Sequence, residues 1–166
     1  MPCAMKPALV KKAQKMAAAI TREIAGEQGA GLFGVEFFVK GKRVIFSELS
    51  PRPHDTGMVT MISQDLSEFD LHVRAVLGLP IAKINYVKGG AASAVILATE
   101  ESADEPGYDG LGAALAMRDV QVRLFGKPST RKYRRMGVAL ATAATPGKAR
   151  KLAVKAAGVV QVEAGR

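Results

Sequence analysis

The chain has 166 residues, of which 48% are apolar and 23% charged, and its formal net charge is +9. These proportions predict one globular domain or two small subdomains with a real core, and they exclude disorder as the main state. No apolar run approaches the roughly 18 residues that span a bilayer, and the N-terminus lacks the apolar stretch of a secretory signal. We therefore expect a cytoplasmic protein. A single cysteine, Cys3, excludes an internal disulfide and a multi-thiolate zinc site.

The positive charge is concentrated in residues 121–166, which hold eleven Lys or Arg residues and one acidic residue. Such a segment attracts nucleic acid, an acidic membrane surface or a small phosphorylated ligand. The chain has no Trp, six Phe and three Tyr, so stacking partners for single-stranded nucleic acid are scarce. A small phosphate-bearing ligand explains the basic segment at least as well as a nucleic acid does. We expect neither a nucleic acid nor a membrane as partner.

The first half of the chain predicts two helices and a hairpin. Apolar residues at helical spacing predict a helix from Pro7 to Ala25, which the proline can open and the following glycine can end. Residues 31–50 are rich in Val, Ile and Phe on both sides of a Lys-Gly-Lys turn, which is typical of a β-hairpin. A capping box at Ser67 to Asp70 predicts a short helix that runs to Leu77.

The second half mixes strands and helices without a clean parallel repeat. In order, it predicts a buried strand at 91–99, an acidic loop at 100–109, a small helix at 111–117, a strand at 120–125, a basic loop at 126–135, a strand at 136–142, a helix at 145–157 and a closing strand at 159–162. This order predicts the α/β class with α+β character. The Pro80 to Gly90 segment is the expected seam, with one domain at 1–82 and the other at 83–166.

Two glutamates lie symmetrically about the hairpin turn. If the turn has an odd number of residues, Glu36 pairs with Glu48, Phe38 with Phe46 and residue 40 with 44, while Val35, Phe37 and Val39 occupy the opposite face and pair with Leu49, Ser47 and Ile45. Like charges directly opposite each other are destabilising unless a cation lies between them. Mg²⁺ binds carboxylate oxygens and shares its other positions with phosphate and water. The two phenylalanines beside the carboxylates suit a nucleotide. The alternative is that both glutamates are ordinary polar residues on the wet face of a hairpin.

The hairpin is followed by a stiff loop, Ser50-Pro51-Arg52-Pro53-His54-Asp55-Thr56-Gly57. Its two prolines restrict the backbone on either side of Arg52. The loop therefore delivers a guanidinium, an imidazole and a carboxylate beside the proposed metal. A role for His54 in this site stays open.

These residues resemble a known family. The spacing of Glu36, Glu48 and Arg52 resembles the metal and phosphate strand of ATP-grasp enzymes. The segment from 31 to 80 and the SPRPHDTG block within it resemble, more closely, the formate-dependent glycinamide ribonucleotide transformylases, also called phosphoribosylglycinamide formyltransferases. The likeness continues through VRLFGKP, RRMGVALA and KAAGVVQV and covers nearly the whole chain, with departures in the acidic loop and in STRKY at 129–133.

The resemblance implies an activity and a set of site residues. The activity is the ATP-dependent conversion of formate to formyl phosphate, followed by transfer of the formyl group to the glycinamide amine in purine synthesis. Glu36 and Glu48 would hold Mg²⁺ on the ATP phosphates, and Arg52, by analogy with the wider superfamily, would stabilise the transferring phosphoryl group. Phe38 is assigned to the nucleotide from its expected place beside the two carboxylates. The remaining assignments, as ligands of the ribotide, are Asp55, Lys127, Arg134 and Arg135.

The basic loop at 126–135 agrees with such a role, since arginine offers bidentate and lysine point-charge contacts to phosphate. In a regular strand the neighbours Arg134 and Arg135 would point in opposite directions, so one of them is expected at a bend or strand end. A proline inside Gly126-Lys127-Pro128-Ser129 excludes a P-loop reading of this segment.

The resemblance also implies missing parts. A complete member has an amino-terminal domain and an ATP-binding lid ahead of this segment and forms a homodimer. We therefore expect this chain to be the carboxy-terminal part of such an enzyme, through truncation, a split gene or fragmentation, and to be inactive without the remainder. Two alternatives stay open: a non-catalytic binding or assembly fragment that keeps the fold, and a nucleic-acid-binding protein whose affinity falls steeply with salt.

Overall fold

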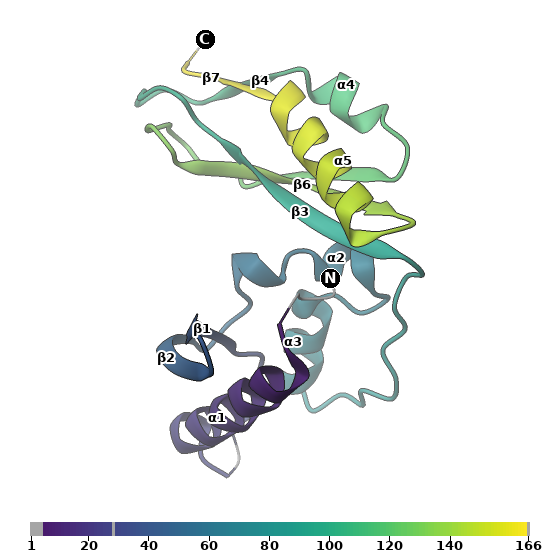
Figure 1. Ribbon diagram of the computed structural model, residues 1–166. Helices are drawn as coiled ribbons and strands as arrows, with labels where there is room; N and C mark the ends of the chain where they lie inside the picture. Colours follow the sequence, from purple (N-terminus) through teal and green to yellow (C-terminus); the bar gives the residue numbers. More distant parts are fainter. Residues whose placement is uncertain (1–4, 28, 166) are drawn as a thin grey trace. The chain divides into compact units, whose positions relative to one another are not determined.

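The computed structural model describes residues 5–27 and 29–165, which form two compact units. One unit runs to Thr60 and includes Asp65–Asn85, and the other comprises Met61–Gln64 and the chain from Tyr86 onward. Among the described residues no helix is both long and apolar enough to cross a membrane. The elements of each unit are drawn in Figure 1.

The first unit contains three helical elements and a hairpin. Helix α1 (Pro7–Ala25) has the predicted bounds, with the proline in its first turn and Gly26 at its end in the left-handed φ region. Helix α3 (Glu68–Val76) carries the predicted capping box, in which the Ser67 side chain and the Asp70 carboxylate cap each other's backbone N–H. The remaining elements of this unit are strands β1 (Gly34–Lys40) and β2 (Arg43–Ser50) and the short 3-10 helix η1 (Asp55–Gly57). The next helix, α2 (Thr60–Ser63), lies in the second unit except for its first residue.

The second unit is built on a three-stranded antiparallel sheet in the order β3-β6-β5. Its strands are β3 (Gly90–Leu97), β5 (Val120–Leu124) and β6 (Arg135–Ala143), and its helices are α4 (Leu111–Leu115) and α5 (Pro146–Val159). Strand β4 (Gly107–Asp109) pairs with β7 (Gln161–Glu163). Residues 107–109 were expected in the acidic loop; this prediction was wrong, because they pair with a strand more than fifty residues further along the chain, a contact that no local pattern indicates. The mixed α/β class with antiparallel sheets is confirmed.

The core of this unit lies on the central strand. Residues 136–141 of β6 are all buried, and α5 covers the sheet with three alanines that have no exposed surface, Ala149, Ala153 and Ala156. Figure 1 shows the yellow α5 lying along β3 and β6, against which it packs. Small side chains allow this close approach, and burial of both faces explains why β6 lacks the alternation of a half-exposed strand. The basic loop joins β5 to β6, the central strand of this sheet.

Candidate functional site

The hairpin places its two glutamates directly across from each other. Glu36 pairs with Glu48 and Val35 with Leu49, as predicted. One carboxylate oxygen of each glutamate and one ring nitrogen of His54 all lie within 4.8 Å of one another. The prediction that both glutamates share a face is thereby confirmed for the hairpin root.

Nearer the turn, the predicted pairing is wrong. A bulge at Ser47 shifts the register by one residue, so that Phe38 pairs with Ile45 and Lys40 with Arg43 across a two-residue turn. The predicted pairs of 38 with 46, 40 with 44, 37 with 47 and 39 with 45 therefore do not form.

The shifted register also changes the apolar neighbours of the carboxylates. Phe46 lies on the opposite face from that predicted, where its ring meets Phe37 edge to face at 6.3 Å. The apolar surface on the glutamate face is instead formed by Phe38, which is 66% exposed, and its cross-strand partner Ile45. Phe38 thus keeps the position assigned to it, with a different neighbour.

The loop after the hairpin brings His54 to the two carboxylates. The His54 Nε2 atom lies 3.5 Å from Glu36 Oε1. On its other side, His54 Nδ1 lies 2.9 Å from the Thr56 hydroxyl and 3.2 Å from Asp55 Oδ1. Carboxylate oxygens are the ligands that Mg²⁺ prefers, and an imidazole suits transition-metal ions, so the three side chains fit a divalent cation.

Arg52 and Asp55 lie on either side of His54 in the sequence. The Arg52 guanidinium is exposed and donates a hydrogen bond to the Pro53 carbonyl at 2.9 Å. Asp55 is half-buried and begins η1, with its carboxylate against the His54 ring. The loop therefore brings the imidazole of His54 to both the Asp55 carboxylate and the glutamates, whereas the Arg52 guanidinium hydrogen-bonds within the loop.

Sequence reasoning gave no role to Glu68, which is 3% exposed. Its Oε2 atom accepts a hydrogen bond from the backbone N–H of His54 at 3.1 Å. Burial raises the pKa of this carboxyl group, while the His54 N–H bond and the His54 charge act in the opposite direction. The first turn of a helix is an ordinary place for an exposed glutamate, so the sequence contained no signal that this one is buried.

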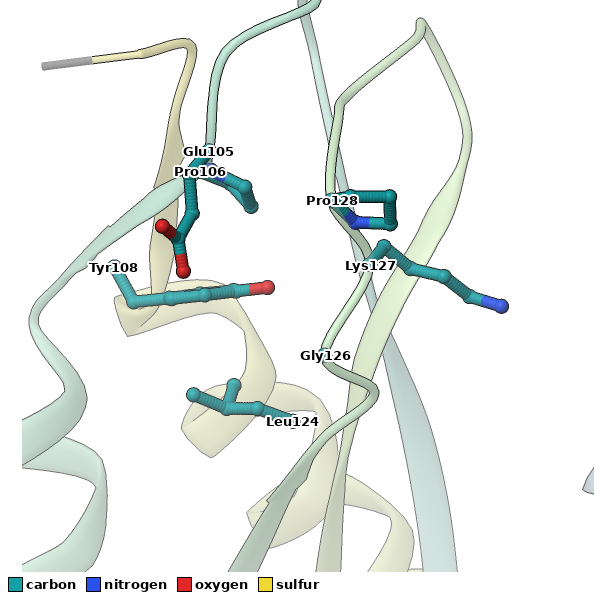
Figure 2. A pocket seen from close by; sticks show the side chains of 7 residues that line it. All are labelled: Glu105, Pro106, Tyr108, Leu124, Gly126, Lys127 and Pro128. Atoms are coloured by element: carbon teal, nitrogen blue, oxygen red, sulfur yellow. The ribbon is translucent and has the colours of Figure 1, made fainter.

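The basic loop belongs to the second unit, and its cations line two cavities. Lys127 lines a cavity of about 430 Å³ together with Glu105, Tyr108, Leu124 and neighbouring backbone. In Figure 2 the Lys127 side chain points away from the Tyr108 ring and the Glu105 carboxylate. Arg134 lines a second cavity of about 470 Å³ with Ser129, Thr130 and Arg131.

The two predicted arginines occupy different local positions. Arg134 precedes β6, and its guanidinium turns back to donate to the Ser129 carbonyl at 3.0 Å and hydroxyl at 2.7 Å. Arg135 is the first residue of β6. The expectation that one of them lies at a bend or strand end is confirmed, whereas their convergence with Lys127 on one phosphate stays a prediction.

Comparison with known proteins assigns relatives to both parts of the chain. Residues 1–69 match the model of the ATP-grasp domain, and residues 91–160 match the model described as PurT, C-terminal. The chain is 54% identical over 161 residues to the formate-dependent phosphoribosylglycinamide formyltransferase of Geobacter metallireducens, covering 97% of this chain and 40% of the relative. The enzyme of the same name from Synechococcus elongatus is 56% identical over 162 residues, covering 98% of this chain and 40% of the relative. The chain thus spans less than half the length of these curated relatives.

Solved structures show the same fold. The N5-carboxyaminoimidazole ribonucleotide synthetase of Thermotoga maritima has a TM-score of 0.83 at 28% identity, covering 98% of this chain and 45% of its own. The glycinamide-RNase-transformylase T of Mycobacterium tuberculosis has a TM-score of 0.74 at 32% identity, covering 96% and 44%. A carboxyaminoimidazole ribonucleotide synthase from Aspergillus clavatus, solved in complex with ATP, has a TM-score of 0.70 at 26% identity, covering 94% and 40%. These matches relate the chain to the carboxy-terminal part of the formate-dependent phosphoribosylglycinamide formyltransferases of the ATP-grasp superfamily.

Proposed function

We propose that the chain supplies the metal-binding and ribotide-binding part of an enzyme that formylates glycinamide ribonucleotide, using formate and ATP, in de novo purine synthesis. The observation that carries this proposal is the convergence of Glu36, Glu48 and His54 on one face of the hairpin root. Relatives named for this activity support it. In this proposal residues 1–82 are the end of an ATP-grasp domain and residues 83–166 are a subdomain that contributes the basic loop.

The reaction proceeds in two group transfers. A formate oxygen attacks the γ-phosphorus of ATP and ADP leaves, which gives formyl phosphate. The glycinamide amine then attacks the formyl carbon, inorganic phosphate leaves, and the amine loses a proton. Catalysis of the first step is mainly positioning and electrostatics, because charge is spread over the transferring phosphoryl oxygens.

The first unit would serve the nucleotide and the phosphoryl group. Glu36 and Glu48 would hold Mg²⁺, which would neutralise charge on the ATP phosphates. Arg52 lies four residues after Glu48, where its guanidinium stabilises the phosphoryl oxygens, and the exposed Phe38 offers the nucleotide an apolar surface. The curated relatives are more than twice as long as this chain, and in such an enzyme the remaining part would close over these groups. We therefore expect no measurable formyl transfer from residues 1–166 alone.

Lys127, Arg134 and Arg135 would hold the phosphate of the ribotide. The separate assignment for Asp55 is that its carboxylate would accept a hydrogen bond from the glycinamide amine. A charge-assisted hydrogen bond contributes about 1.5–3 kcal/mol. Replacing either arginine by alanine in a complete enzyme should therefore raise the KM for the ribotide at least about tenfold. The KM for ATP should barely change. Arg134→Gln is the matched control for the loop, because its amide can still donate to Ser129 but carries no positive charge. We expect this variant to lose ribotide affinity as Arg134→Ala does.

The test is a chimera in which this chain replaces the matching 161 residues of the Geobacter metallireducens relative. We expect the chimera to form formylglycinamide ribonucleotide only with ATP, formate and Mg²⁺. Glu48→Gln should lower kcat at least about a hundredfold, the loss typical when one electrostatic stabiliser is removed. Glu23→Gln on α1, an exposed position, is the matched charge control and should have no effect.

Two results would overturn the proposal. One is a folded, soluble chimera that is inactive while the parent enzyme is active, which would favour the non-catalytic assembly fragment. The other is activity that survives both Glu36→Gln and Glu48→Gln, because the hairpin would then hold no essential metal.

A further inference from the structure

A buried carboxylate lies beneath the loop that carries His54. Glu68 is the first residue of α3, is 3% exposed, and accepts the His54 N–H at its Oε2 atom. Its Oε1 atom is buried and has no hydrogen-bond partner among the residues that the structure describes. Burying a carboxylate is costly unless specific hydrogen bonds compensate. The cost points to a task for this side chain in the loop above it.

The main chain of Glu68 holds the other end of the same loop. Its backbone N–H donates to the Thr60 hydroxyl oxygen at 2.9 Å, and this hydroxyl donates to the Gly57 carbonyl at 2.6 Å. Glu68 thus holds the loop directly at His54 through its side chain, and at Gly57 through its backbone and the intervening Thr60 hydroxyl. The η1 turn is held between these two ties.

Two glycines leave room for this arrangement. A Cβ atom on Gly57 would lie 2.1 Å from Glu68 Oε2, and a Cβ atom on Gly34 would lie 2.8 Å from His54 Cβ. Neither distance is sterically possible without a shift of the neighbouring atoms. The loop is therefore packed directly on the Glu68 carboxylate on one side, and His54 on strand β1 on the other.

We propose that Glu68 is a positioning residue, whose carboxylate fixes the His54 backbone so that the imidazole lies against Glu36. That Glu36, Glu48 and His54 bind a metal ion rests on the proposed function. The positioning of His54 by Glu68 does not. In this arrangement the three donor groups are in place before a cation arrives, so that binding does not have to order the loop.

The test compares two substitutions of similar size in the 166-residue chain. Glu68→Gln keeps a side-chain oxygen that can accept the His54 N–H, and Glu68→Met fills the same space without an acceptor. The readouts are Mn²⁺ affinity by calorimetry, the exchange rate of the His54 amide by NMR, and the Tm. We expect Glu68→Met to weaken Mn²⁺ binding at least tenfold and to speed His54 exchange at least tenfold. Glu68→Gln should stay within threefold of the wild type in both.

Three results would overturn this role for Glu68. Unchanged Mn²⁺ affinity and exchange in Glu68→Met, even with a lower Tm, would leave the residue a purely structural part. Equal losses in the Gln and Met variants would mean that charge, and not the acceptor, matters. A fall in His54 protection no larger than that of a distant loop amide would show general loosening. If the wild-type chain binds no Mn²⁺, the proposed metal site fails, and His54 exchange alone still decides the role of Glu68.

Discussion

Replacing Glu48 by glutamine should stabilise the metal-free chain. Glu36 and Glu48 are direct cross-strand partners whose carboxylate oxygens come within 4.8 Å, a separation at which two unit charges repel by about 0.9 kcal/mol in water. Like charges at such paired positions cost roughly 0.2–1 kcal/mol. We therefore expect Glu48→Gln to raise the free energy of unfolding by about 0.5–1 kcal/mol, or the Tm by about 1–4 °C. Glu48 is the better choice because Glu36 also contacts His54.

Added Mg²⁺ should reverse this order. At a free concentration ten times its Kd, Mg²⁺ stabilises the wild-type chain by about 1.4 kcal/mol, and the variant that lacks one carboxylate gains less. Thermal unfolding in chelator and in a Mg²⁺ series measures both effects. Glu23→Gln is the control: in a chain of net charge +9, removing an acid elsewhere gives no gain. A Glu48→Gln variant that is no more stable than wild type in chelator would refute the argument that the two carboxylates repel.

Three further changes test other parts of the structure. Hydrogen bonds from Ser67 lower the pKa of Asp70, so their contribution is complete above the unfolded-state pKa of this group and is lost as the pH falls through its lower folded-state pKa. Ser67→Ala should cost about 1 kcal/mol at neutral pH and flatten this acid dependence, as followed by denaturant unfolding at several pH values. Tyr133 has a φ of 65°, so Tyr133→Gly should be more stable than Tyr133→Val by about 1–2 kcal/mol in the same assay; equal stabilities would show that the backbone simply relaxes. Leu140 has no exposed surface on β6, and Leu140→Ala should cost about 2–5 kcal/mol, whereas a cost below 1 would contradict its place in the core.

The elements that the sequence predicted well are those with local signals. Pro7 and Gly26 mark the two ends of α1, and Ser67 with Asp70 marks the start of α3. Each signal acts within a few residues: proline lacks an N–H donor, glycine adopts a positive φ, and the two capping side chains bond each other's backbone. No knowledge of tertiary contacts was therefore needed to predict these helix ends. The pairing of Glu36 with Glu48 followed from counting because the hairpin root and the assumed register agree.

The features that could not be predicted depend on inserted residues or distant contacts. Predicting strand pairs by counting from the turn assumes that every residue of one strand has a partner on the other. The bulge at Ser47 leaves one residue without a cross-strand partner, and no Gly or Pro near it indicates a bulge. The approach of His54 to Glu68 joins positions fourteen residues apart through tertiary packing. Hydrophobic periodicity reports which face is apolar and contains no information on such a contact between two polar residues.

The two compact units are interleaved along the chain, which limits how the protein can be divided. Met61–Gln64 belong with the chain from Tyr86 onward, where the Val87 N–H donates to the Ser63 carbonyl at 2.9 Å and Gln64 bridges to Tyr86. No single cut in the chain separates the units, because Met61–Gln64 would be severed from Tyr86 and Val87 or left attached to the wrong unit. Circular permutation, tag insertion or expression of halves should therefore avoid the stretch from 60 to 87. For the same reason, exchange between related enzymes will succeed more readily with the whole interleaved module than with either unit.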